Sequence, residues 1–185
     1  MFEERNVATM NREIAVSRDR NLAMRETASE RQYLTFCLAG EQYGIDILKV
    51  REIRGWTPVT QIPNVPAFVR GVMNLRGVIV PVIDLRSRFG LDTVAYSSTT
   101  VVIVAMIQKE ASDHIAGLVV DGVSDVLNIR AGEIQPPPDF GAAVNIEFIN
   151  GLVTLETSMT MLLDVDQLLA VETLFTLAAP DQMAA

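Results

Sequence analysis

Several residue types are scarce in this sequence, and each scarcity excludes a class of protein or site. Cys37 is the single cysteine of the chain, so no internal disulfide can form, which suits a reducing compartment. With one histidine, His114, and one cysteine, the sequence has no cluster with zinc-ligand spacing, and we expect neither a metal nor a cofactor. No run of about 18 apolar residues occurs, so we expect no segment inserted in a membrane.

Basic residues are also scarce. Lysine occurs only twice, the formal net charge is −8 and the isoelectric point is about 4.6. Such a chain is repelled by phosphate backbones, and a nucleic-acid-binding β-barrel would also need exposed aromatic residues, whereas tryptophan occurs once, at Trp56. We therefore expect no nucleic-acid partner. The N-terminus lacks the apolar core of a secretory signal, so we expect a cytoplasmic protein.

The composition of the chain changes near residue 31, from polar to largely apolar segments. Residues 1–30 are polar, with five arginines balancing five acidic residues among the first 29, which is typical of a flexible leader. Short β-branched runs follow at 33–40, 42–47, 99–107 and 114–123, separated by glycine- and proline-rich turns. These features predict an all-β domain over residues 31–175 with short helices, followed by a tail at 176–185.

An internal repeat organises this domain. Two offsets relate its halves, 80 residues in one region and 73 in another. The matched pairs are Gly71–Gly151, Leu75–Leu155, Asp84–Asp164, Phe89–Leu169, Gly44–Gly117, Val50–Val123 and Ile53–Val126. The repeat predicts two modules of about five strands each, which form two β-barrel subdomains, split and interleaved along the chain, with an apolar interface and a groove between them.

The segment LRGV, residues 75–78, predicts a tight hairpin with Arg76 at its tip, because Gly77 accepts the positive φ that such turns require. Arg76 is either a solvated turn residue or a donor fork for a partner's carboxylate or carbonyl groups, and Glu52 is expected to hold it. Pro81 lacks a backbone N–H, which favours an edge strand or a bulge.

Two aspartates are expected to cap short helices. Asp84 precedes LRSRF, which Gly90 would close, and Asp164 precedes VDQLL. His114, beside Asp113 in a polar stretch, is better explained as an exposed loop residue than as a general base or a phosphorylation site, since no nucleophile or presenting helix accompanies it. We therefore expect no enzyme activity.

The segments YGIDILKVREIRG, PAFVRGVMNLRGVIVPVIDLRSRFG, TVVIV and VVDGVSDVL together resemble the CheW family of bacterial chemotaxis coupling proteins, over roughly residues 32–172. The resemblance implies two SH3-like five-stranded barrels around a shared core. It also implies a non-catalytic adaptor that couples methyl-accepting chemoreceptors to the CheA histidine kinase, recruited to receptor arrays at the membrane. The alternative is a CheW-like scaffold of a non-flagellar chemosensory pathway, such as one that controls twitching.

The resemblance also implies where the partners bind. The cytoplasmic tip of the receptor would lie in the groove between the barrels, and the regulatory domain of the kinase would dock barrel to barrel. Carried over by motif, the receptor groove comprises Val50, Glu52, Arg76, Val102, Gly117 and Val123. By hydrophobicity alone, the three valines would be ordinary core residues.

Overall fold

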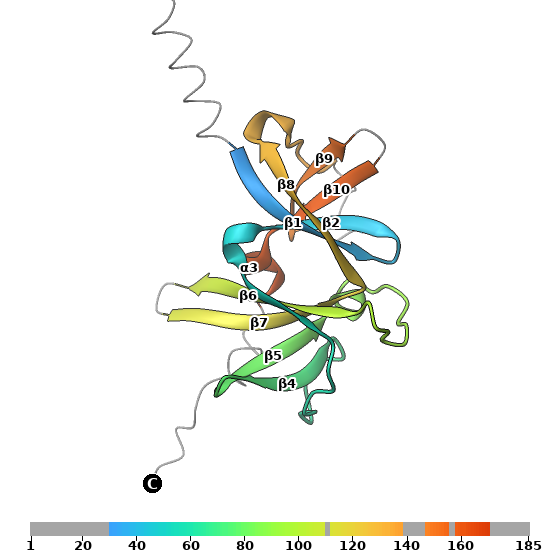
Figure 1. Ribbon diagram of the computed structural model, residues 1–185, viewed down its shortest axis with the longest axis vertical. Helices are drawn as coiled ribbons and strands as arrows, with labels where there is room; N and C mark the ends of the chain where they lie inside the picture. Colours follow the sequence, from blue (N-terminus) through green and yellow to red (C-terminus); the bar gives the residue numbers. More distant parts are fainter. Residues whose placement is uncertain (1–29, 110–111, 139–146, 156–157, 171–185) are drawn as a thin grey trace, which may run out of the picture.

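The structure, a computed structural model, describes residues 30–109, 112–138, 147–155 and 158–170. Almost the whole of the expected leader and all of the tail at 176–185 lie outside these residues. The described part is almost entirely β-structure in two five-stranded sheets (Figure 1), which confirms the predicted fold class.

Each sheet contains strands from both halves of the chain. The first sheet has the order β8-β1-β2-β10-β9, with β1 (Glu30–Leu38), β2 (Glu41–Asp46), β8 (Gly122–Arg130), β9 (Ile149–Leu155) and β10 (Ser158–Leu163). The second sheet has the order β3-β6-β7-β5-β4, with β3 (Val50–Gly55), β4 (Val69–Leu75), β5 (Val78–Asp84), β6 (Val101–Lys109) and β7 (Ser112–Val120). The helical turns are η1 (Ile47–Lys49), α2 (Leu85–Arg88), η2 (Ala131–Glu133) and α3 (Val165–Leu168).

The two repeats exchange strands, because each sheet combines the first two strands of one repeat with the last three strands of the other. At the offset of 73, β3 is equivalent to β8, yet β3 pairs with β6 of the second repeat and β8 pairs with β1 of the first. All pairs of equivalent strands, β3 and β8 included, occupy equivalent places in their sheets, so one sheet order maps onto the other. The two sheets are therefore interleaved along the chain, and neither is a product of one half alone.

A pair of backbone hydrogen bonds closes each sheet into a barrel. In the second sheet, the segment after β3 returns to β4, where Thr60 and Val72 exchange N–H···O bonds of 2.9 and 2.8 Å. In the first sheet, the segment after β8 returns to β9, where Gln135 and Leu152 exchange two bonds of 2.8 Å. The order β8 to β9 is thus the first barrel, and the order β3 to β4 is the second barrel.

The closures explain why glycine recurs at positions 71 and 151. A Cβ on Gly71 would overlap the carbonyl oxygen of Thr60, and its φ of +138° is one that L-residues rarely adopt. A Cβ on Gly151 would overlap the side chain of Ile134. The repeated glycine therefore marks the place where the closing segment crosses the barrel wall.

One apolar core lies between the barrels, and smaller cores lie inside them. The shared core takes residues from β1, β2, β6 and β7 and from both α-helices, including Phe36, Ile45, Ile103 and Leu118, each fully buried. Burial of this interface is the main stabilising term that joins the two small barrels.

Pro81 is not on an edge strand, because β5 lies between β4 and β7. Its partner Val72 directs its own N–H and carbonyl to Thr60, and pairing with β7 begins only at Val82. A proline fits there because no strand is positioned to accept a hydrogen bond from that residue.

Candidate partner-binding site

The β4–β5 hairpin presents Arg76 at its tip, as predicted. Leu75 pairs with Val78, which leaves a two-residue turn, and Arg76 and Gly77 have φ values of 53° and 89°. Positive φ at both central residues is the type I′ geometry that matches the twist of a hairpin. The Asn74 side-chain oxygen accepts a 2.7 Å hydrogen bond from the Gly77 N–H and fixes the turn. The Arg76 side chain is 86% exposed.

Glu52 on β3 holds this arginine, which confirms the expected contact. The Arg76 Nη2 atom donates to Glu52 Oε2 at 3.2 Å, and Arg54 Nε lies 3.8 Å from Glu52 Oε1. Exposed pairs of this kind contribute only about 0–1 kcal/mol to folding. Because one of five guanidinium N–H groups makes this bond, the pair orients Arg76 while leaving donors directed at solvent.

Exposed apolar residues are close to this pair in the sequence. Val78 and Ile79 follow the turn and are 51% and 44% exposed, and Ile53, next to Glu52, is 44% exposed. Ile53 pairs with Ile103 and Val50 pairs with Ala105, both shared-core residues, so Val50 and Ile53 lie on the face of β3 that meets the first barrel. Val50 is half-buried against the shared core.

In the first barrel, β8, the strand equivalent to β3, provides an equivalent rim. Val123 pairs with Phe36 and Val126 pairs with Leu34, and both partners belong to the shared core. Val123 is half-buried, and Val126 is 41% exposed. We call Val50 and Ile53 the β3 rim, and Val123 and Val126 the β8 rim.

Two predicted groove residues lie elsewhere. Val102 is 3% exposed and packs inside the second barrel with Val82 and Val119. Gly117 is buried on the same side, where an added Cβ would lie 2.8 Å from Val102 Cγ1. Neither offers a surface to a partner here. On the opposite face of β6, Val101 is half-buried against the shared core and pairs with Gly55 of β3.

Both predicted caps are present, and one belongs to a larger cluster. Asp164 accepts from the Gln167 N–H at 3.0 Å and caps α3. Asp84 accepts from the Arg86 and Ser87 N–H groups to cap α2, which ends before Gly90 at φ 69°. The Tyr96 hydroxyl also donates to Asp84, at 2.7 Å.

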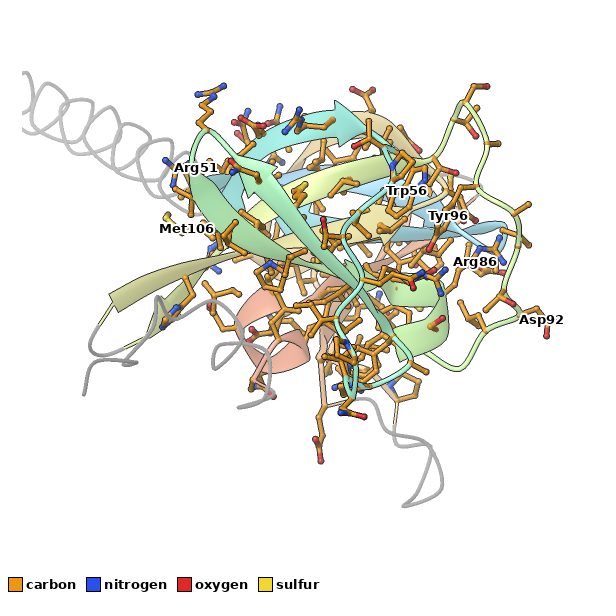
Figure 2. All side chains as sticks on the ribbon, turned by 90° about the horizontal axis from the view of Figure 1, so that it is seen from below. Arg51, Trp56, Arg86, Asp92, Tyr96 and Met106 are labelled. Atoms are coloured by element: carbon orange, nitrogen blue, oxygen red, sulfur yellow. The ribbon has the colours of Figure 1, made fainter. Side chains whose placement is uncertain are left out.

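Tyr96 and Trp56 cover one end of the second barrel. Their ring centroids are 4.2 Å apart (Figure 2), and both pack against Val82, Val102 and Val119. Burial, followed by the hydrogen bond to Asp84, raises the pKa of Tyr96 well above its ordinary value. The Tyr96 hydroxyl therefore stays protonated, and its hydrogen bond to Asp84 holds the loop between α2 and β6 in place.

His114 is not a loop residue. It lies in β7, half-buried, and pairs with Ile107 of β6. Cys37 of β1 is half-buried, with Sγ 3.5 Å from Ser124 Oγ. Among the residues that the structure describes, no group of three His, Cys, Asp or Glu side chains is placed to hold a metal ion, and no helix is long and apolar enough to cross a membrane.

A separate hollow lies beside the β2–β3 connection. Its volume is about 610 Å³, and its lining includes Asp46, Ile47 and Leu48 from the connection and Asn128 from β8. Leu48 is 80% exposed. None of the predicted groove residues lines this hollow.

Comparison with known proteins identifies the family. The model of the CheW-like domain matches residues 32–173. The chemotaxis protein CheW of Klebsiella aerogenes is 49% identical over 141 residues, which cover 76% of this chain and 82% of the relative. The chemotaxis protein CheW of Rhizobium meliloti is 36% identical over 146 residues, which cover 79% and 92%.

A solved structure agrees with these matches. The scaffolding protein TtCheW of Thermoanaerobacter tengcongensis superposes with a TM-score of 0.67 at 35% identity, over 75% of this chain and 86% of that chain. Residues 32–173, which match the family model, contain the NLRG hairpin and almost all of the two interleaved barrels. The chain therefore belongs to the family of CheW-like domains.

Proposed function

We propose that this protein is a non-catalytic chemotaxis adaptor that couples methyl-accepting chemoreceptors to a CheA-type histidine kinase. Its membership of the CheW-like family and its relatives named chemotaxis protein CheW support the role in chemotaxis. The observation that carries the proposal is the presentation of Arg76, 86% exposed on a fixed turn and oriented by Glu52. An arginine held in one direction suits the recognition of a partner's carboxylates or carbonyls.

The receptor surface consists of Arg76 and Glu52 together with the β3 rim and the β8 rim. The cytoplasmic tip of a receptor is helical, and a helix docks through apolar anchors about three to four residues apart. Val50, Ile53, Val123 and Val126 supply the complementary apolar area, since each is half-buried or exposed beside the shared core. Arg76 fixes the register of the helix, because charged groups contribute more to specificity than to affinity. Val102 and Gly117 support this surface from inside the second barrel.

An adaptor needs a second surface for its second partner. The exposed Leu48 and the hollow beside it provide one, at the start of the connection to β3 rather than at the hairpin. Leu48 is 80% exposed, so its burial in a partner's apolar pocket would remove apolar surface from water. We assign this surface to the regulatory domain of the kinase, and binding to both partners would bring the protein into receptor arrays at the membrane.

The test separates the two surfaces. The variants Arg76→Ala and Leu48→Asp are measured by calorimetry against a receptor cytoplasmic fragment and against the kinase regulatory domain. Arg76→Ala should weaken receptor binding at least about tenfold, equivalent to about 1.4 kcal/mol, and leave kinase binding within about twofold. Leu48→Asp should show the reverse pattern. Arg130→Ala, which removes another exposed arginine, is the matched control and should change neither affinity.

A functional readout completes the test. In a reconstituted mixture of receptor fragment, kinase and adaptor, the wild-type protein should raise kinase autophosphorylation, and either variant should lower it. Val50→Asp, which places a charge on the β3 rim, should act like Arg76→Ala. If Arg76→Ala and Val50→Asp both bind the receptor fragment as tightly as wild type, the receptor surface has been assigned wrongly.

A further inference from the structure

The chain passes between the barrels twice within the described residues. It leaves the first barrel through η1, between β2 and β3, and returns at Asp121, between β7 and β8. The equivalent strands β3 and β8 begin directly after these crossings. The crossings are therefore the covalent joints between the barrels, and each leads into one of the rims described above.

The return crossing is held by a forked ion pair. Arg86 of α2 donates from Nε and Nη2 to the two carboxylate oxygens of Asp121, at 2.6 Å each. Asp121 Oδ2 also accepts from the Ala39 N–H of the first barrel, at 2.8 Å, and the Asp121 N–H donates to the Cys37 carbonyl. Arg86 Nη1 donates to the Asp92 carbonyl at 2.9 Å. This cluster ties the helix of the second barrel to the β1–β2 turn of the first.

This pair is shielded from solvent. The Arg86 and Asp121 side chains are 15% and 28% exposed. The hydrogen bond from Arg86, ahead of the opposing effect of burial, lowers the pKa of Asp121, so the carboxylate stays charged. The two parallel hydrogen bonds fix the orientation of the Arg86 guanidinium relative to the Asp121 carboxylate as well as their distance, whereas a single hydrogen bond would leave the orientation free.

The outward crossing is held by an ion pair in an equivalent place. Lys49, the last residue of η1, donates to Asp166 of α3 at 2.8 Å. Asp166 is equivalent to Arg86 at the offset of 80, and Lys49 is one residue from the position equivalent to Asp121 at the offset of 73. The charges are reversed, since the cation lies on the helix in one pair and on the crossing in the other. If the helices exchanged crossings, Arg86 would meet Lys49 and Asp166 would meet Asp121, so like charges would face each other. Each helix therefore fits only one of the two crossings.

We propose that these two ion pairs act as staples that set the angle between the barrels, and that Arg86 and Asp121 are thereby positioning residues for the receptor surface. The inference rests on the proposed function, because it is the two rims, one from each barrel, that a receptor helix would span. The Arg86 side chain donates its hydrogen bonds to Asp121 and to the Asp92 carbonyl, which are outside that surface. It acts through the return crossing, which determines where the β8 rim lies relative to the β3 rim.

The barrel angle is measurable without any partner. Residual dipolar couplings of backbone amides in the intact protein report whether one alignment tensor fits both barrels, for wild type and for Arg86→Gln, Asp121→Asn and Arg86→Lys. Asp121→Asn keeps an acceptor for the Ala39 N–H, so it provides a second neutral variant in case Arg86→Gln does not fold. One tensor should fit wild type, and the two neutral variants should each require separate tensors. Arg86→Lys, which keeps the charge without the fork, should lie between them, and Arg130→Gln is the matched control.

Receptor binding supplies the second readout. The neutral variants should bind the receptor fragment about fivefold more weakly or worse, while kinase binding at Leu48 stays unchanged. The exchanged pair Arg86→Asp with Asp121→Arg should recover part of the loss. If a single wild-type tensor still fits both barrels in the variants, or if the angle changes and receptor affinity does not, the staples do not position the surface. If wild type itself fails to bind the receptor fragment, the proposed function fails, and the dipolar couplings still decide whether the staples set the angle.

Discussion

Substitution of Gly71 by alanine tests the closure of the second barrel. An alanine at this position meets two obstacles at once. Its φ of +138° is disfavoured for any L-residue, and its Cβ would overlap the Thr60 carbonyl, which is backbone and cannot rotate away. The closing segment must therefore move outward, and the two Thr60–Val72 hydrogen bonds are lost or stretched.

The magnitude follows from these terms. Backbone strain at such a φ costs about 1–3 kcal/mol, and each lost backbone hydrogen bond costs about 1 kcal/mol. Gly71→Ala should therefore lower the free energy of unfolding by about 3–5 kcal/mol, a large fraction of the roughly 5–15 kcal/mol of a small domain. Gly77→Ala is the control for φ alone, since its φ is +89° and nothing lies within 4 Å of the new Cβ. We expect a loss of about 1 kcal/mol there.

Gly151→Ala separates steric overlap from backbone conformation, because its φ lies outside the disfavoured range and its Cβ meets the Ile134 side chain. A side chain can change rotamer, so we expect an intermediate loss of about 1–3 kcal/mol. Urea unfolding followed by Trp56 fluorescence and by circular dichroism measures all three variants, with the m-value checked for each. A loss for Gly71→Ala no greater than that for Gly77→Ala would refute the argument from close approach.

Two further predictions concern the Asp84 cluster. Asp84→Ala should lower the free energy of unfolding by about 2–4 kcal/mol, because it removes both the cap of α2 and the acceptor of the Tyr96 hydroxyl. The matched variant Asp164→Ala removes only the cap of α3 and should cost about 1 kcal/mol. Equal losses of the two variants in urea unfolding would mean that the Tyr96 hydrogen bond does not contribute to stability. Burial and the bond to Asp84 raise the pKa of Tyr96, so its contribution to stability is complete below the unfolded pKa of about 10 and is lost progressively as the pH rises from that value through the higher folded pKa. Ultraviolet titration of native wild type and Tyr96→Phe near pH 11 should therefore show the same number of phenolates, and one more in wild type would contradict the buried donor.

The sequence predicted the features that local chemistry decides. The Arg76–Gly77 hairpin and the Asp84 and Asp164 caps depend on residues within one turn of each other, so their signals are complete in a short segment. The contact between Glu52 and Arg76 followed from the repeat and the expected packing. The repeat also paired Ile53 with Val126, but hydrophobicity alone gave no sign that both are exposed.

Features that depend on distant strands were harder to predict. The run TTVVIVAMI is apolar at nearly every position, so alternation does not tell which face of β6 enters the barrel, and Val102 was assigned to the groove although Val101 faces the shared core. His114 was placed in a loop because its neighbours are polar, yet backbone pairing with Ile107 keeps it in β7. Arg86 and Asp121 are 35 residues apart, and nothing local indicates that they meet.

The interleaved topology gives the adaptor role a physical basis. The β3 rim begins at Val50, directly after Lys49, and the β8 rim includes Val123, two residues after Asp121. Each rim therefore starts at the joint that carries an ion pair, and both rims rest on the same shared core. A helix bound across the rims contacts both barrels at their joints, next to Leu48, so a partner at one surface can affect the other only by favouring one barrel angle over another. Under the proposed roles of the two surfaces and the two staples, the coupling between receptor and kinase would be limited by how rigidly the staples hold that angle.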